Sequence, residues 1–351
     1  MVGFLLFGSA VFPAQAAFSN LYVFGDSIST TTNNPATGPL YYGQRYSNGR
    51  VWVEVLAQRQ GLTYNANQNW SYFSNTSTTL VANVSSFNAP SDASNALFVI
   101  WVNNSDLYYP ALYDGSSMSQ WTSAINQSQT NHYKAVTNLY AKGARTLIMP
   151  NVVDISTIPK FNTDANTAFI HQECIDYNVA FSNTLNRIRA SCPNLTLYTP
   201  DFFTLLTNLL AYPANYGVTN ALLSGLSIDA VESIPSLTVT NNPGTNYIFW
   251  DNMDPTAKVH MWMANTVQQL ISPVRISQIT SLNGSNQLIM ANVPIGQNGL
   301  VIGRTNLVLG NWTTNANANF NSISATQSVF IKPSGPQWFY RLKFPYSWTW
   351  P

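Results

Sequence analysis

Residues 21–30 read LYVFGDSIST, and this stretch decides the fold of the chain. The apolar residues 21–24 predict a short strand, and Gly25-Asp26-Ser27 follows it without a gap. A polar turn directly after a strand is typical of the carboxyl edge of an open α/β sheet, where ligands bind. Gly25 permits the sharp turn that this junction needs. Ser27 is therefore a candidate nucleophile, and it requires a neighbouring base to take its proton.

Strand and helix signals alternate along the chain after this turn. Residues 96–102 (ALFVIWV) form a continuous apolar run, which is typical of a strand buried on both faces. Further strands are predicted at residues 145–149 and 195–198. Apolar residues at helical spacing predict helices at residues 51–60, about 119–142 and 165–191, after Asp201, and from Pro255 onward. The alternation predicts a parallel sheet with helices on both sides.

The pattern changes after Pro273. Residues 274–351 alternate in polarity, contain turn dipeptides such as Asn283-Gly284 and show no helical period. We therefore expect a main domain at residues 18–273 and a small all-β domain at residues 274–351. An aromatic run with prolines ends the chain, from Trp338 to Trp350. It is interpreted as packing, with a binding surface as the alternative.

Residues 1–17 are predicted to be an export signal. An apolar run over residues 2–12 precedes Pro13 and the small-x-small sequence Ala14-Gln15-Ala16. A membrane anchor is the alternative, but the run is too short to cross about 30 Å of hydrocarbon. We therefore expect a secreted, periplasmic or cell-surface protein without a membrane span in its mature chain.

The composition limits the partners and cofactors. Charged residues make up 8% of the 351 residues and the net charge is +1, with no basic stripe, which excludes nucleic acid as an expected partner. The three histidines do not group with Cys174 and Cys192 at metal-ligand spacing, so no metal or other cofactor is expected. Pairing of the two cysteines stays open, as does the oligomeric state.

Several longer segments resemble the GDSL, or SGNH, esterases and lipases. They occur in that family's order over about residues 20–272, and they are residues 47–57 (SNGRVWVEVLA), 147–154 (LIMPNVVD), 193–218, and Phe249-Trp250-Asp251 followed by Asp254-Pro255-Thr256. The resemblance implies a flavodoxin-like three-layer α/β/α sandwich, to which this chain adds the small C-terminal β domain. It also implies a serine nucleophile at Ser27 and a catalytic acid at Asp251.

The rest of the family's site matches unevenly. The family's oxyanion glycine falls in residues 69–74, which contain no glycine, so the amide of Ser74 is the candidate donor. The oxyanion asparagine aligns with Ser105, and Asn104 or Asn103 serves if the alignment shifts slightly. The family's histidine position holds Asp254.

The base of the reaction is therefore the open question of this sequence. Asp254 precedes Pro255 and is expected to cap the following helix, because proline favours the first helical position. An exposed aspartate with a pKa of about 4 is a poor base for a serine. His260, oriented by Asp251 or Asp254, is the candidate base, with a packed helix residue as the alternative.

Taken together, the residues and the resemblance predict a secreted serine hydrolase that acts on carboxylic esters of small-molecule, lipid or carbohydrate type. The alternative is a protein on an SGNH scaffold with weakened catalysis, which binds carbohydrate or a cell-surface polymer. The missing histidine favours this alternative, whereas Ser27 and Asp251 favour the enzyme.

Overall fold

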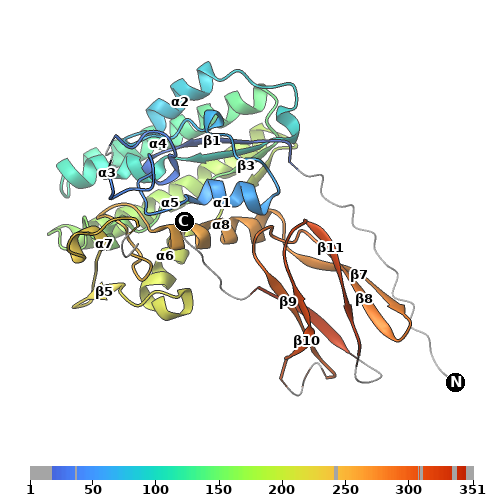
Figure 1. Ribbon diagram of the computed structural model, residues 1–351. Coiled ribbons are helices and arrows are strands. Elements are labelled where there is room, and N and C mark those ends of the chain that lie inside the picture. The colour runs from blue at the N-terminus through green and yellow to red at the C-terminus, as the bar shows by residue number, and fades with distance from the viewer. Residues whose placement is uncertain are drawn as a thin grey trace.

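The computed structural model describes residues 18–35, 38–240, 244–306, 308, 311–333 and 338–344. The predicted export signal, residues 1–17, and the aromatic residues beyond 344 lie outside the described residues. Figure 1 shows a larger domain of sheet and helices, with a smaller group of strands beside it.

A parallel sheet forms the centre of the larger domain. Its strands lie in the spatial order β1-β2-β3-β4, and they are β1 (Leu21–Gly25), β2 (Leu97–Trp101), β3 (Thr146–Ile148) and β4 (Thr196–Tyr198). Leu21 lies opposite Leu97, and Leu97 lies opposite Thr146. Every residue of β1 and β2 is buried, as their continuous apolar sequences predict.

A single extra pairing extends this sheet at the outer side of β1. Val23 pairs in parallel with Asn69, and the Trp70 amide donates to the Val23 carbonyl at 2.8 Å. A segment that lies between β1 and β2 in sequence therefore sits outside β1 in space. This is the flavodoxin-like strand order, with its second strand reduced to one bridge.

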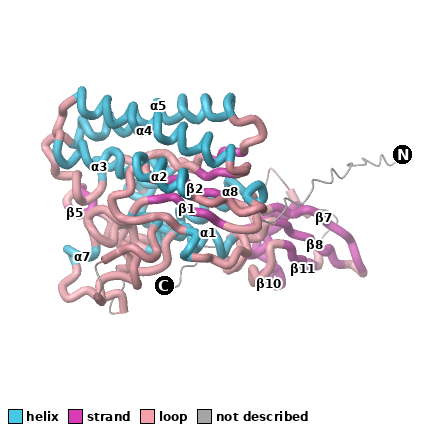
Figure 2. The backbone as a smooth tube through the Cα atoms, turned by 90° about the horizontal axis from the view of Figure 1, so that it is seen from above, coloured by secondary structure: helices cyan, strands magenta, loops and turns pink. Residues whose placement is uncertain are grey.

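Helices cover both faces of the sheet (Figures 1 and 2). One face carries α2 (Ser77–Ser86), α3 (Asn103–Tyr113), α4 (Met118–Ala141) and α5 (Thr167–Ser191). The other carries α1 (Trp52–Arg59), α6 (Phe202–Ala211) and α8 (Ala257–Ile271), with the short α7 (Ala230–Ser233) at the domain's end. Trp52 of α1, Trp101 of β2 and Phe202 of α6 pack edge to face in the core. The predicted α/β sandwich is confirmed.

Helices α2 and α3 were not predicted. Helix α2 is rich in Ser, Thr and Asn, which are weak helix formers, and buries only Ser77, Leu80 and Val84. Helix α3 starts with a polar turn and contains Pro110, which usually disfavours a helix interior. The carboxyl end of β2 therefore leads into the N-terminus of a helix.

The smaller group of strands contains two antiparallel sheets of three strands each, ordered β11-β8-β7 and β10-β9-β12. The strands are β7 (Arg275–Leu282), β8 (Ser285–Ala291), β9 (Gly299–Arg304), β10 (Thr313–Phe320), β11 (Thr326–Ile331) and β12 (Phe339–Lys343). Leu288, Val301 and Ile331 form a core separate from the main one. This separation supports the proposed boundary near Pro273.

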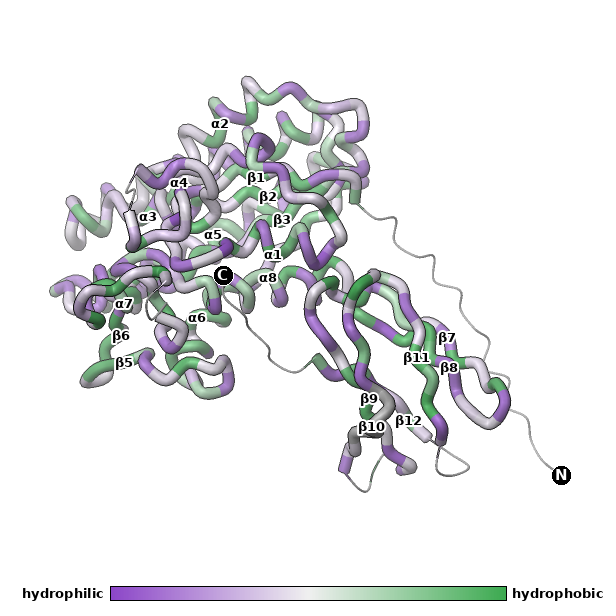
Figure 3. The backbone as a smooth tube through the Cα atoms, viewed as in Figure 1, coloured by the Kyte–Doolittle hydropathy of each residue, from purple (hydrophilic) through white to green (hydrophobic). Residues whose placement is uncertain are grey.

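Hydrophobic residues recur along the buried strands of the central sheet and along α6, as Figure 3 shows.

Cys174 and Cys192 are both buried and free, so no disulfide joins them. Within the described ranges, none of the helices combines the length and the apolar character that crossing a bilayer requires.

Candidate active site

Ser27 lies at the carboxyl end of β1, on the short 3-10 helix Ser27–Ser29. The carboxylate of Asp26 caps this turn by accepting the Ile28 amide at 3.2 Å. A Cβ atom on Gly25 would lie 2.7 Å from both the Ser29 Cβ and the Ser71 Oγ, so only glycine fits before the turn. The turn therefore holds Ser27 in one place, with 3% of its surface exposed.

The side chain of Asp254 is the hydrogen-bond partner of Ser27. Ser27 Oγ donates to Asp254 Oδ1 at 2.9 Å, inside a buried region. Burial raises the pKa of Asp254 well above its ordinary value, and the nearby Asp251 carboxylate raises it further, while the Ser27 hydrogen bond opposes both. A carboxylate in such a site is a stronger base than an exposed one.

Asp251 organises the loop that carries Asp254. Its Oδ1 accepts the amides of Met253 at 3.0 Å and Asp254 at 2.8 Å. Its Oδ2 accepts the Tyr41 hydroxyl at 2.8 Å. Burial raises the pKa of Asp251, and these three hydrogen bonds act against that rise. Asp251 thus reaches Ser27 only indirectly, through the backbone of Asp254.

Ser47 and Asn48 hold the same loop from the other side. Ser47 Oγ donates to the Pro255 carbonyl at 3.0 Å, and Asn48 Oδ1 accepts the Ala257 amide at 2.7 Å. Helix α8 therefore begins at Ala257, with Thr256 before it and Asn48 satisfying its first amide. The expectation that Asp254 caps a helix starting at Pro255 is wrong, and its carboxylate is left to bind Ser27.

His260 does not reach Ser27, contrary to expectation. It lies in the first turns of α8 with no exposed surface, and neither ring nitrogen makes a hydrogen bond to any described residue. Burial lowers its pKa to about 3, which keeps the ring neutral. Because α8 starts later than predicted, the imidazole enters the helix packing, and Asp254 takes the place beside the serine.

Two candidate oxyanion donors lie around the Ser27 turn. Ser74 has a φ of 65°, in the left-handed region that favours glycine, so the backbone keeps a glycine-like turn there. The side-chain Nδ2 of the neighbouring Asn75 donates to the Gly25 carbonyl at 2.9 Å and so ties this turn to the end of β1.

The amide side chain of Asn104 is the second candidate donor. Its Oδ1 accepts the Val153 amide at 3.1 Å, whereas its Nδ2 is buried without a partner among the described residues. Ser105 is different, since its Oγ donates to Asp26 Oδ2 at 3.1 Å. Burial raises the pKa of Asp26 to about 7. Asn103 Nδ2 also has a partner, the Pro150 carbonyl at 2.9 Å.

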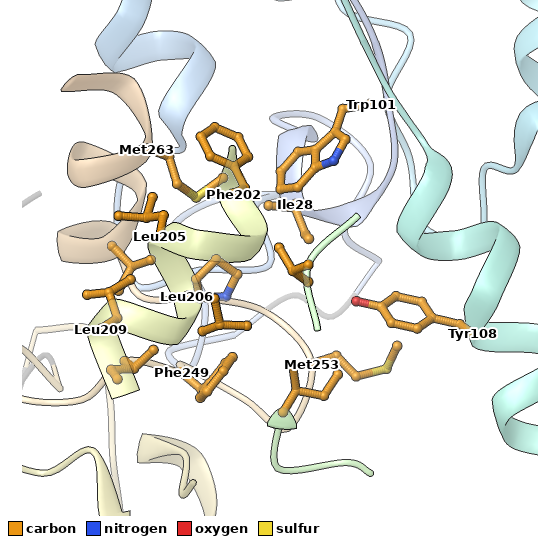
Figure 4. A pocket seen from close by; sticks show the side chains of 15 residues that line it. Ile28, Trp101, Tyr108, Phe202, Leu205, Leu206, Leu209, Phe249, Met253 and Met263 are labelled. Carbon is orange, nitrogen blue, oxygen red and sulfur yellow. The ribbon is translucent and has the colours of Figure 1, made fainter. Parts of the chain in front are cut away.

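Two hollows adjoin the Asp254 loop. A cleft of about 260 Å³ is lined by Tyr41, Tyr46 and Phe73 and by the carboxylates of Asp229, Glu232, Asp251 and Asp254. A smaller cavity of about 40 Å³ is almost wholly apolar, and Figure 4 shows side chains such as Ile28, Leu206 and Met263 around it. Met253 lines both hollows.

Sequence reasoning missed Tyr41, Ser47, Asn48 and Tyr108 as parts of this region. Ser47 and Asn48 belong to a segment that resembles the family, but their contacts span more than 200 residues of sequence, which no local pattern reveals. Tyr41 lies in a loop without a periodic signal. The polar SNG sequence before a helix was the one available hint that these residues hold another segment.

A serine at the carboxyl edge of a parallel sheet that is hydrogen-bonded to an aspartate before the last helix is an arrangement suited to nucleophilic catalysis in an α/β protein. A family model described as GDSL-like Lipase/Acylhydrolase matches residues 21–267, more than half of the chain. The chain belongs to this GDSL-like lipase/acylhydrolase family.

Individual relatives are more distant. A GDSL esterase/lipase of Arabidopsis thaliana is 23% identical over 195 residues, covering 51% of this chain and 53% of that protein. An acetylesterase of Thermothelomyces thermophilus is 22% identical over 284 residues, covering 70% and 86%. The chain spans about half the length of the Arabidopsis relatives it matches.

A solved structure of similar kind is the lipase Lip_vut3 from a goat rumen metagenome. It has a TM-score of 0.44 and 10% identity, and the match covers 72% of this chain and 97% of that one.

Proposed function

We propose that this chain hydrolyses carboxylic esters with Ser27 as the nucleophile and Asp254 as its base. The observation that carries the proposal is the buried hydrogen bond of 2.9 Å from Ser27 Oγ to Asp254 Oδ1. It gives the serine a proton acceptor at the distance that general-base catalysis needs. The raised pKa of Asp254 brings its basicity closer to what a serine requires.

The proposed reaction has two halves. Asp254 takes the Ser27 proton while Oγ bonds to the ester carbonyl carbon, and the proton then passes to the departing alcohol. In the second half Asp254 takes a proton from water, which attacks the acyl-serine, and Ser27 regains a proton as the free acid leaves. Asp251 acts as a positioning residue, since it holds the amide of Asp254 rather than its carboxylate.

The oxyanion of each half needs preorganised donors. Asn104 Nδ2 is proposed as one, because its Oδ1 is held by Val153 and its donor group has no other partner among the described residues. The amides of the Ser27 turn and of Ser74 complete the proposed set. Each such donor contributes about 10²–10³ in rate.

Family membership and the ready Ser27–Asp254 pair favour the hydrolase over the carbohydrate-binding alternative. Export is part of the same proposal, and it rests on the sequence of residues 1–17. The alcohol half of the ester is proposed to lie in the cleft, whose three aromatic rings suit a small neutral alcohol.

The proposal is tested with purified full-length protein and p-nitrophenyl butyrate. A fluorophosphonate probe should label Ser27, as located by peptide mass spectrometry, and Ser27→Ala should lose both label and hydrolysis. Ser29→Ala is the matched control on the same turn, and it should keep both. Equal hydrolysis by wild type and Ser27→Ala would remove Ser27 from the mechanism.

A further inference from the structure

The apolar cavity of about 40 Å³ is lined by residues that adjoin Ser27 and Asp254 in the chain. Ile28 follows the nucleophile, Met253 and Pro255 flank Asp254, and Val153 is the residue whose amide orients Asn104. The neighbours of the nucleophile, base and oxyanion donor therefore share one hollow. The cavity contains no charged lining residue.

We propose that this cavity receives the acyl chain of the ester and limits it to about four carbons. The inference rests on the proposed ester hydrolase function and names the substrate class of that site. A cavity needs roughly 10–15 Å³, measured by a water-sized sphere, for each water it holds. A volume of about 40 Å³ therefore takes roughly three groups of methylene size beyond the carbonyl.

The contrast with the open cleft fixes the orientation of the ester. The cleft carries four carboxylates and three aromatic rings, so burying an alkyl chain there would leave charged groups poorly solvated. The apolar cavity gains from the same chain by removing it from water. Met253 lines both hollows, so the two are adjacent, and the proposal puts the alcohol in the cleft and the acyl chain in the cavity.

Tyr108 brings one polar group to the cavity. It is 8% exposed, its hydroxyl makes no hydrogen bond to any described residue, and Figure 4 shows that hydroxyl directed toward the other lining side chains. Burial raises the pKa of Tyr108 well above its ordinary value, so the group stays neutral. A neutral hydroxyl at the wall tolerates a short alkyl chain, whereas a charged one would not.

Two substitutions on α6 change the cavity in opposite directions. Leu206 lines it and is 7% exposed, so Leu206→Ala enlarges it. Leu205 lines it from a half-buried position, where Leu205→Phe fills it with little strain. Leu210 lies on the same helix without lining the cavity, so Leu210→Ala is the matched control.

The test compares kcat/KM of the full-length protein for p-nitrophenyl acetate, butyrate, hexanoate and octanoate. In the wild type the value should fall at least tenfold from butyrate to octanoate, since even a single methylene that does not fit a hydrophobic pocket costs a factor of about 10–200. Leu206→Ala should raise the hexanoate-to-butyrate ratio about tenfold, and Leu205→Phe should lower the butyrate-to-acetate ratio. Ratios within one variant are unaffected by a loss of folded protein.

Unchanged ratios in both variants, or a wild type that prefers octanoate, would overturn the acyl-cavity proposal. A second measurement separates it from the proposed function. Ser27→Ala is titrated with 2-pentanone and 2-nonanone, and binding is followed by the change in tryptophan fluorescence, because Trp101 lines the cavity. Tighter binding of the shorter ketone supports the cavity even if no ester is hydrolysed, and tighter binding of the longer one contradicts it.

Discussion

Ser27 and Asp254 are 227 residues apart in sequence, and their side chains form a buried hydrogen bond of 2.9 Å. The contact arises because β1 ends at the same edge of the sheet as the loop before α8. Ser47, Asn48 and Asp251 fix that loop from both sides. The aspartate therefore occupies the place where the family resemblance leads one to expect a histidine.

Asp254 should limit the stability of the fold at neutral pH. Its raised pKa means that the folded chain binds the Asp254 proton more tightly than the unfolded chain, whose aspartate has a pKa of about 3.9. The stabilising contribution of that proton is therefore present below about pH 4 and is lost as the pH rises through the raised folded pKa. We expect Asp254→Asn to raise Tm relative to wild type, and to raise it more at pH 8 than at pH 4. A difference in Tm that shrinks toward pH 8 in thermal melts would contradict this.

His260 should matter for acid stability and not for catalysis. Its folded pKa of about 3 lies below the unfolded value of about 6.5, so wild-type stability falls as the pH drops through that interval. His260→Leu should abolish this loss of stability at low pH, and it also removes two buried nitrogens that have no hydrogen-bond partner among the described residues. Its gain in unfolding free energy should be about 2–3 kcal/mol larger at pH 4.5 than at pH 8, measured by urea denaturation. Ester hydrolysis at pH 8 should be retained, and its abolition in a folded variant would restore His260 as the base.

Asn104 should contribute to the transition state, whereas its neighbour should not. Asn104→Ala is expected to lower kcat for p-nitrophenyl butyrate about 10²–10³-fold with little change in KM. Asn103→Ala is the matched control, because Asn103 Nδ2 is already bonded to the Pro150 carbonyl. That variant should lose stability and keep its kcat. The assignment fails if the two variants have the same kcat after correction for the folded fraction.

The larger domain should fold without the β domain. The main core and the small core share no residues, and Arg59 Nη1 to the Ile295 carbonyl at 2.9 Å is among the few polar contacts between them. A protein ending at residue 273 should remain soluble and keep most of its hydrolysis of p-nitrophenyl butyrate. Aggregation of this shortened chain, beside an active full-length protein, would show that the β domain covers an apolar surface of the sandwich.

Much of the fold could be predicted because buried strands and amphipathic helices have strong local patterns. The apolar run at 96–102 became β2, and the helical period at 165–191 became α5. Helix α3 was missed because its first turn is polar and Pro110 interrupts it, so local sequence argued against it. The place of Ser27, the proposed nucleophile, at the end of β1 followed from the strand-to-turn junction alone.

The hydrogen-bond partner of Ser27 could not be predicted in the same way. Proline at position 255 favoured a helix start there, but the distant Asn48 side chain sets the start at Ala257. Asp254 therefore stands before the helix, beside Ser27, and His260 lies within the helix. The spacing of residues along one helix cannot reveal the contact of Asn48 with that helix, because Asn48 is 209 residues away from the amide that it accepts.

The most direct test of the central claim is the pH dependence of acylation in wild type, Asp254→Asn and Asp254→His. Acylation is followed as the release of p-nitrophenol from p-nitrophenyl butyrate under single-turnover conditions, with the protein in excess over the ester. If Asp254 is the base, Asp254→Asn should slow acylation about 10²–10⁴-fold at pH 8 and abolish its acid limb. Asp254→His should recover part of the rate, with an acid limb near the ordinary histidine pKa of about 6.5. The account would be contradicted if the fluorophosphonate probe still labelled Ser27 in Asp254→Asn and this variant were acylated by the ester at the wild-type rate.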